Sequence, residues 1–165
     1  MSTYSIEIKW GILFVLMQLA WMIAERLAGL HDVHIAQHHI YSNFVAIPAI
    51  AVYVFALLDK RRSFYGGYMT FRQGFISGLF ITLVVTLLSP LTQYLTSEVI
   101  SPEYFSNVIR HSVESGMMTQ QQAEEYFNLK SYLMQVVIAT PLMGLITTLI
   151  VAFFVRKNPP PDHSA

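Results

Sequence analysis

The chain of 165 residues contains no cysteine, so it has neither a disulfide framework nor a thiolate zinc site. Charged residues are also scarce, at 12% of the chain, where soluble domains carry about 25%. Ten cationic and ten acidic residues cancel, and a net charge of zero argues against nucleic acid as a partner. Hydrophobic residues make up 54% of the sequence, which is typical of a chain that spends most of its length in a bilayer.

Two long uncharged runs flank a basic segment that contains Lys60, Arg61 and Arg62. This pattern is typical of a membrane hairpin, because a helix of about 20 residues crosses the hydrocarbon core. We predict an all-α integral membrane four-helix bundle, formed by a single membrane domain of residues 1–158. The predicted spans are residues 10–28, 40–58, 74–95 and 132–155.

Residues 101–130, between the third and fourth spans, are polar and predict an insert of two short helices. Ser101 followed by Pro102 has the features of a helix start, and Gly116 those of a helix end. Thr119 and Gln122 have the spacing of a capping box, which places the start of the second helix there. The proline-rich residues 159–165 predict a disordered tail.

The charges predict an orientation. With four spans, the two termini and the second turn share one side, which holds seven cations against three acids. The opposite side holds three cations against seven acids. Because cation-rich segments stay in the cytoplasm, we predict an inner-membrane protein with both termini inside and the insert outside.

The clearest chemical pattern is the segment 31–39, which contains four histidines and Asp32. On a helix His31, His34 and His38 would share a face, and the i, i+4 spacing of His34 and His38 suits a divalent transition metal. The alternative is that neutral histidines cap helix ends at a wet interface, because the usual zinc-site spacings are not matched.

Glu25 and Gln18 lie seven residues apart and therefore share a face of the first span. An acidic residue within a span is a candidate proton or substrate site. The alternative is a structural ion pair between Glu25 and Arg26 at the interface. A membrane-embedded hydrolase is a third hypothesis, and it requires Gln18, Glu25, Gln93 and Gln135 to converge.

The third span opens with a G-x-x-x-G pattern at Gly74 and Gly78, which permits close approach of another helix. That helix belongs to the same bundle, to a second copy in a homo-oligomer, or to another membrane protein. Polar residues recur at helical spacing farther along the span and predict a stripe that faces protein and not lipid: Thr82, Thr86, Ser89 and Gln93.

The sequence resembles a family of small bacterial membrane proteins known only as a domain of unknown function. The likeness covers about residues 10–157. It rests on Glu25 with His31-Asp32 and on short segments of similar sequence: 41–43, 46–50, 69–78, 89–94, 116–119 and 123–127. The resemblance implies a four-span protein of the inner membrane of a Gram-negative bacterium. It brings no assigned activity and no catalytic residue.

Two functional hypotheses follow. The first is a multi-pass membrane protein with a structural or interaction role and no enzymatic activity, because no convergent catalytic set is evident. The second is a small transporter or a metal- or proton-handling protein that uses Glu25 with His31, His34 and His38.

Overall fold

The computed structural model describes residues 4–160 and is helical throughout, with no β-strand within that range. Two long helices, separated by a short one, come first in the chain: α1 (Ser5–Leu27), α2 (Ile35–Tyr41), the 3₁₀ turn η1 (Ser42–Val45) and α3 (Ala46–Ser63). The remainder consists of α4 (Phe71–Tyr94), the π-helical turn η2 (Leu95–Ile100), α5 (Tyr104–Glu114), α6 (Gln120–Tyr126) and α7 (Leu129–Val155). The predicted tail lies outside the described residues from position 161 onward.

Four helical segments are long and apolar enough to cross a membrane, as predicted: Ser5–Leu27, Ile35–Ser63, Phe71–Ile100 and Leu129–Val155. The protein is therefore an all-α membrane helical bundle. Each segment extends beyond the predicted span at one end or both. The predictions stopped at charged or polar residues, whereas a helix continues past them for as long as its backbone groups remain paired.

The start of α4 shows this difference well. The third span was predicted from Gly74, but the helix begins at Phe71 because Thr70 and Gln73 form a capping box. The Thr70 hydroxyl accepts from the Gln73 backbone N–H, and the Gln73 side chain accepts from the Thr70 N–H. Lys60, Arg61 and Arg62, which were predicted to lie in the preceding turn, lie instead in the last turn of α3. Cations are stabilised there by the negative end of the helix dipole.

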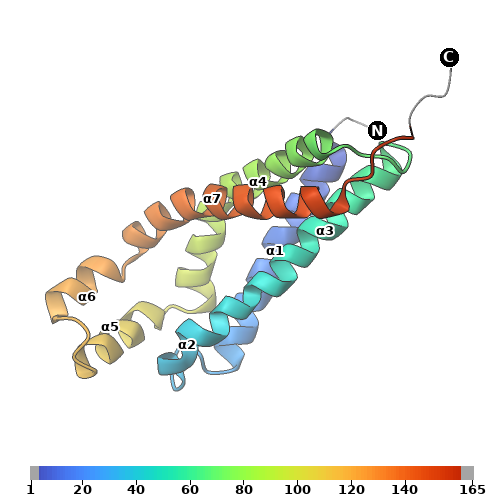
Figure 1. The fold of residues 1–165 in the computed structure, drawn as a ribbon. Coiled ribbons are helices and arrows are strands. Elements are labelled where there is room, and N and C mark those ends of the chain that lie inside the picture. The colour runs from blue at the N-terminus through green and yellow to red at the C-terminus, as the bar shows by residue number, and fades with distance from the viewer. Residues whose placement is uncertain (1–3, 161–165) are drawn as a thin grey trace, which may run out of the picture.

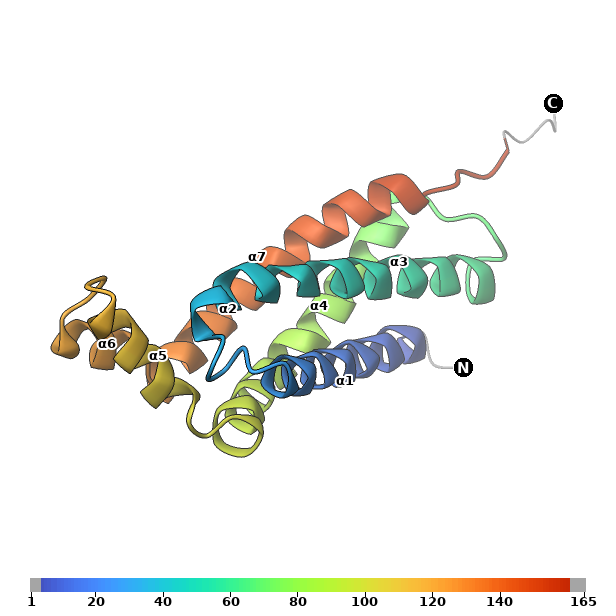
Figure 2. The ribbon, with the colours of Figure 1, turned by 90° about the horizontal axis from the view of Figure 1, so that it is seen from below.

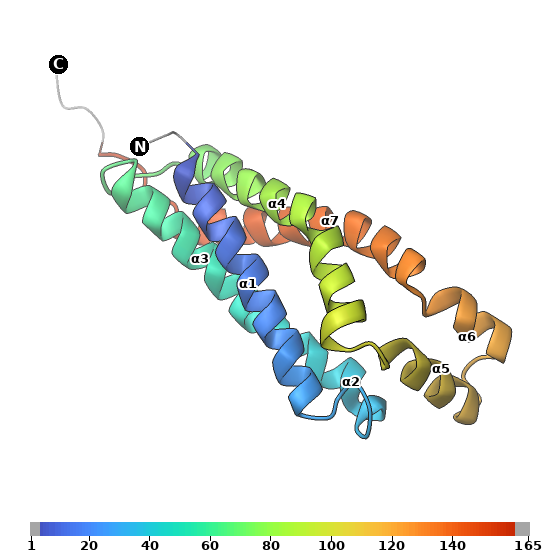
Figure 3. The ribbon, with the colours of Figure 1, turned by 180° about the vertical axis from the view of Figure 1, so that it is seen from behind.

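The bundle is packed at one end and spread at the other (Figure 1). The closed end contains the start of α1, the turn between α3 and α4, and the end of α7. The splayed end contains α2, α5 and α6, and Figure 2 shows these short helices far from the start of α1. Toward the splayed end α4 contains Pro90 and passes into η2, and this part of the chain diverges from α7 (Figure 3).

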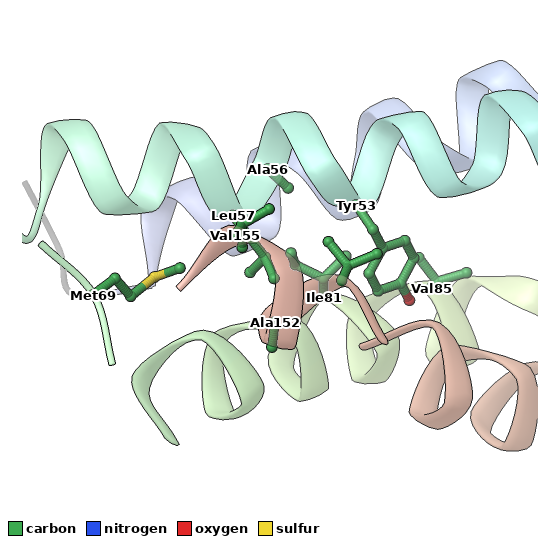
Figure 4. Packing of buried hydrophobic residues seen from close by; sticks show 9 residues of the cluster. Tyr53, Ala56, Leu57, Met69, Ile81, Val85, Ala152 and Val155 are labelled. Atoms are coloured by element: carbon green, nitrogen blue, oxygen red, sulfur yellow. The ribbon is translucent and has the colours of Figure 1, made fainter. Parts of the chain in front are cut away.

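The hydrophobic core sits toward the closed end, between α3, α4 and α7 (Figure 4). The two long helices α4 and α7 make the closest contact, through paired glycines and threonines. A Cβ atom on Gly78 would lie 2.5 Å from Thr148 Cγ2, and one on Gly144 would lie within 3.0 Å of the Thr82 side chain. The predicted close approach at Gly78 is therefore made inside the monomer.

Backbone contacts tie the closed end together. Met69 and Lys157 exchange two hydrogen bonds of 2.8 Å, which join the turn before α4 to the residues after α7. Arg61 Nη1 donates to the Val155 carbonyl at 2.6 Å, satisfying one of the carbonyls left free at the C-terminus of α7. The turn itself contains Gly66 and Gly67, both with positive φ, a conformation that glycine adopts without steric cost.

The insert consists of two short helices, as predicted, although the first begins later than expected. Thr119 and Gln122 form the predicted capping box of α6. In contrast, α5 begins at Tyr104, and Ser101 does not cap it. The Ser101 side chain is buried and contacts His31 instead.

Candidate metal centre at the splayed end

Glu25 lies in the last turn of α1 and is only 3% exposed. One carboxylate oxygen, Oε1, accepts from Trp21 Nε1 at 2.5 Å, across one turn of the same helix. The other oxygen, Oε2, lies 3.2 Å from His31 Nε2 and 3.5 Å from His38 Nε2. One donor atom from each of the three residues lies within 4.8 Å of the others. The carboxylate therefore has one oxygen fixed by the helix and one directed at two imidazoles.

The chain reverses direction after α1 in a way that brings His31 back to Glu25. The Leu30 N–H donates to the Glu25 carbonyl and the Gly29 N–H donates to the Arg26 carbonyl, both at 3.0 Å. This pair of bonds is a Schellman motif, and its αL position is occupied by Gly29 with φ of +74°. His31 follows directly, and its side chain is placed over the last turn of the helix that carries Glu25.

His31 is held by the insert on its other side. Its Nδ1 lies 2.5 Å from Ser101 Oγ, and its carbonyl accepts from Asn107 Nδ2 at 3.0 Å. The Tyr104 ring makes an edge contact with the His31 ring, with centroids 5.3 Å apart. A metal-binding histidine usually bonds through its second nitrogen to a fixed partner that orients the ring. Ser101 occupies that position here.

His38 lies on α2, and its Nε2 atom is buried without a hydrogen-bond partner. At 3.5 Å the contact to Glu25 Oε2 is too long to count as a good hydrogen bond. The His38 ring also packs against Tyr104, with centroids 5.2 Å apart. Its nitrogen is thus aimed at the carboxylate, and a buried polar atom in this state is costly unless something else binds it.

The two distances from the carboxylate to the imidazoles fit a shared cation. Two donor atoms that each lie about 2.1 Å from a tetrahedral metal ion are about 3.4 Å apart. The separations of Glu25 Oε2 from His31 Nε2 and from His38 Nε2, 3.2 and 3.5 Å, lie on either side of that value. Two imidazoles and one carboxylate are a donor set that suits zinc or iron(II) and leaves coordination positions open.

Tyr104 closes the site on the side of the insert. Its phenol lies near that of Tyr132, and burial is the main reason why the pKa of Tyr104 is raised far above its usual range. The side chain therefore remains a neutral phenol at physiological pH. It supplies an aromatic wall to both histidines without adding a charge.

The structure brings together some of the predicted site residues and leaves others apart. His31 and His38 join Glu25, whereas His34 is exposed and precedes the first residue of α2. The i, i+4 pairing of His34 with His38 requires one continuous helix, and the helix begins only at Ile35. Arg26 is exposed, and the described partners of the Glu25 carboxylate are Trp21 and the two histidines.

The four residues of the predicted hydrolase site do not converge. Gln18 and Gln93 both line a cavity between the spanning helices, and Glu25 is not among its lining residues. Gln135 is exposed on α7 and its side chain donates to Ser131 at 3.2 Å. Gln18 and Glu25 share a helix face but are directed into different surroundings.

Several residues of the site were not anticipated. Trp21 precedes Glu25 by one helical turn, so the spacing alone contained a signal for it. The sequence contained no signal for the roles of Ser101, Tyr104 and Asn107, because these roles depend on how the insert folds back onto α1. The charge count behind the predicted orientation also gave no sign that Glu7 and Lys60 pair, and they form a buried ion pair at the closed end.

Residues 9–157 match a protein family described as "protein of unknown function (DUF4199)". The match covers most of the chain, and the chain belongs to this family. No curated protein and no solved structure matches it.

Proposed function

We propose that this member of the DUF4199 family binds a divalent transition-metal ion between Glu25, His31 and His38. The observation that carries the proposal is the buried His38 Nε2, which has no hydrogen-bond partner. It lies 3.5 Å from a carboxylate oxygen that is also 3.2 Å from His31 Nε2. A cation among the three atoms satisfies all of them at once.

Protons alone satisfy this cluster less completely than a metal ion does. Each neutral imidazole can carry its own proton on Nε2, and His31 then donates to Glu25 Oε2 at 3.2 Å. His38 in the same tautomer lies 3.5 Å from that oxygen, which is too long for a good hydrogen bond, so its Nε2 atom stays poorly paired. A metal ion coordinates several donors simultaneously, and one donor atom from each of the three residues lies within 4.8 Å of the others.

The proposed role is metal handling at one surface of the bacterial inner membrane. Three protein ligands leave at least one position for water or an exchanging ligand, which suits capture or transfer of the ion. The site lies at the end of α1 and not in its middle, so an ion reaches it without crossing the hydrocarbon core. The ligands come from α1, α2 and the turn between them, and the insert supports them.

The proposed orientation places the closed end in the cytoplasm. The closed end carries the basic residues of the last turn of α3 and of positions 156–157, whereas the insert at the splayed end is acidic. Because the chain has no cysteine, single cysteines report orientation cleanly. We expect a membrane-impermeant maleimide to label Gln121→Cys in intact spheroplasts and Ser63→Cys only after lysis. The reverse pattern would overturn the orientation without affecting the metal proposal.

A structural role without enzymatic activity is the second candidate function. It is supported by the contacts that join His31 to the insert, through Ser101 Oγ and Asn107 Nδ2. In this alternative Glu25 and the histidines hold the insert against α1, and no ion is required. The two candidates differ in whether the protein takes up metal.

The test is metal content and metal-induced stabilisation of the purified full-length protein. After exposure to Zn²⁺ and removal of free ions, we expect about one ion per chain in the original protein. His38→Ala should lose the ion, whereas His34→Ala serves as the matched control because His34 is exposed and outside the cluster. Equal metal content in the original protein and in His38→Ala would reject the metal site and favour the structural role.

A further inference from the structure

A cavity of about 640 Å³ lies between all four spanning helices. Its volume falls within the range of about 300–1,000 Å³ that is usual for small-molecule sites. The inner walls are formed by Phe14 of α1, Tyr53 of α3, and the buried Val85 and Val151 of α4 and α7. The cavity therefore extends into the core of the bundle.

The polar groups that line the cavity are all uncharged. They are hydroxyls and side-chain amides, and the lining includes no Asp, Glu, Lys, Arg or His. An ionised group placed here would have no counter-ion and would lose its hydration. The chemistry of the walls therefore selects an uncharged occupant.

The amides are grouped toward the splayed end of the cavity. Gln18 lies in the second half of α1, Asn43 directly before α3, and Gln93 in the last turn of α4. The deeper part is lined mainly by apolar side chains, with Thr147 of α7 among them, and the Tyr53 hydroxyl is already paired with Thr82 at 2.8 Å. The cavity is thus more polar at one end than at the other, as a bilayer amphiphile is.

Gln18 and Ser42 are polar groups of the lining that the protein itself satisfies poorly, and the Ser42 hydroxyl is buried without a hydrogen-bond partner. The lining hydroxyls of Thr92 and Thr96 donate to carbonyls of their own helix. The Gln18 amide instead contacts Met22 Sδ at 3.9 Å, and a thioether is a weak acceptor. An amide among spanning helices gains much from a better partner, because lipid tails offer none.

The rim of the cavity faces the membrane. Ile50 on α3 and Met143 and Ile146 on α7 line the cavity and are also well exposed. All three lie within spanning helices, so the medium that they contact is hydrocarbon. An occupant enters from the bilayer and not from water.

From these observations we infer that the cavity binds an uncharged single-headed membrane amphiphile. Its carbonyl or hydroxyl head lies at Gln18, Asn43 and Gln93, and its hydrocarbon tail is directed toward Val85. This site is separate from the metal site, and neither proposal depends on the other.

The test uses a monoacylglycerol with a photoreactive diazirine on its chain, incorporated in nanodiscs with the full-length protein. The matched probe is the fatty acid of the same chain, which is ionised at pH 8. We expect the neutral probe to label the buried residues around Val85 and Val151 as well as lipid-exposed residues. The fatty acid should label only the exposed ones.

Two variants make the result specific. Ala49→Phe fills the cavity from α3 and should abolish labelling at Val85, whereas Ile47→Phe on the exposed face of the same helix should not. Gln18→Leu should weaken competition by unlabelled monoacylglycerol about fivefold, which corresponds to about 1 kcal/mol for one hydrogen bond. Gln135→Leu, which removes an exposed amide outside the cavity, should have no effect.

Labelling confined to exposed residues, or unchanged at Val85 in Ala49→Phe, would overturn the inference. Equal labelling of the buried residues by the ionised fatty acid would overturn its requirement for a neutral occupant. A thermal unfolding transition like that of the original protein shows that Ala49→Phe is folded, whether or not the protein binds zinc. A failure of this test is then distinguishable from a failure of the metal proposal.

Discussion

Glu7 of α1 and Lys60 of α3 form an ion pair of 2.8 Å with side chains that are only 2% and 3% exposed. Ser77 of α4 donates to the same carboxylate oxygen at 2.7 Å, and the Lys60 ammonium lies 3.9 Å from the centroid of the Phe64 ring. Three spanning helices therefore meet at one buried charge pair at the closed end. A second pair, Lys9 with Asp59 at 2.5 Å, lies nearer the surface of the same end.

Removing one member of the buried pair should be strongly destabilising. Lys60→Met leaves the Glu7 carboxylate buried without its counter-ion, and we expect a loss of about 3–5 kcal/mol in the free energy of unfolding. The double variant Glu7→Gln with Lys60→Met should recover much of that loss, because no uncompensated charge remains. Denaturant titration in detergent of the single and double variants measures the difference. Additive losses in the double variant would show that the two charges do not depend on each other.

The contact between Gly78 and Thr148 predicts a rescue. Gly78→Ala places a methyl group 2.5 Å from Thr148 Cγ2, and overpacking of this kind costs about 1–3 kcal/mol. Thr148→Ala removes the two atoms that approach most closely, and the Thr148 hydroxyl has no hydrogen-bond partner to lose. We expect the double variant to be more stable than Gly78→Ala alone. Thermal unfolding of the single and double variants tests this. An absence of rescue would mean that Gly78→Ala separates α4 from α7 whatever the size of the side chain at position 148.

Ser101 should act as a positioning residue for the proposed metal site. Ser101→Ala removes the partner of His31 Nδ1, and loss of such a partner typically lowers metal affinity about 10- to 100-fold. Ser115→Ala is a suitable control because Ser115 lies at the end of α5 and bonds only within the insert. Competition with a zinc indicator measures the affinities. The same affinity in both variants would mean that the His31 ring is oriented without Ser101.

Metal affinity should also fall on acidification. An imidazole binds a metal ion only when it is unprotonated, so protons compete with zinc at His31 and His38. We expect zinc to be released between pH 8 and pH 5 in the original protein, with the His34→Ala control following the same curve. Zinc measured by indicator at each pH gives the result. Release that is independent of pH in this range would argue against histidine ligands.

Burial raises the pKa of Tyr104, which predicts a specific loss of stability in alkali. The neutral phenol is favoured in the folded state, so its contribution is fully present below the ordinary tyrosine pKa of about 10. Above that pH the unfolded chain gains stability by ionising and the folded chain does not. In Tyr104→Phe the free energy of unfolding should therefore fall less steeply as the pH rises above about 10. The control Tyr126→Phe, at an exposed position, should leave this pH dependence almost unchanged. Identical alkaline unfolding curves for the two variants would contradict this.

The sequence by itself determined the number and class of the spanning helices and the local signals at several of their ends. The free energy of inserting a helix into a bilayer is a sum over its own residues, so composition along a window is sufficient to identify it. The capping box at Thr119 and the break at Gly66 and Gly67 are equally local. These features need no knowledge of neighbouring helices.

Only the tertiary structure decided which polar side chains meet. Glu25 lies near His31 and His38 but not near His34. The Schellman turn after α1 brings His31 back to Glu25, and α2 begins only after His34, so His34 and His38 do not share a helix face. Glu7 finds Lys60 across 53 positions of sequence, and Gln18 faces a cavity because α7 leans away from α1. Such meetings depend on the rotation and tilt of each helix against the others. Those angles are set by packing at contacts such as Gly78 with Thr148, which the residues of a single helix do not specify.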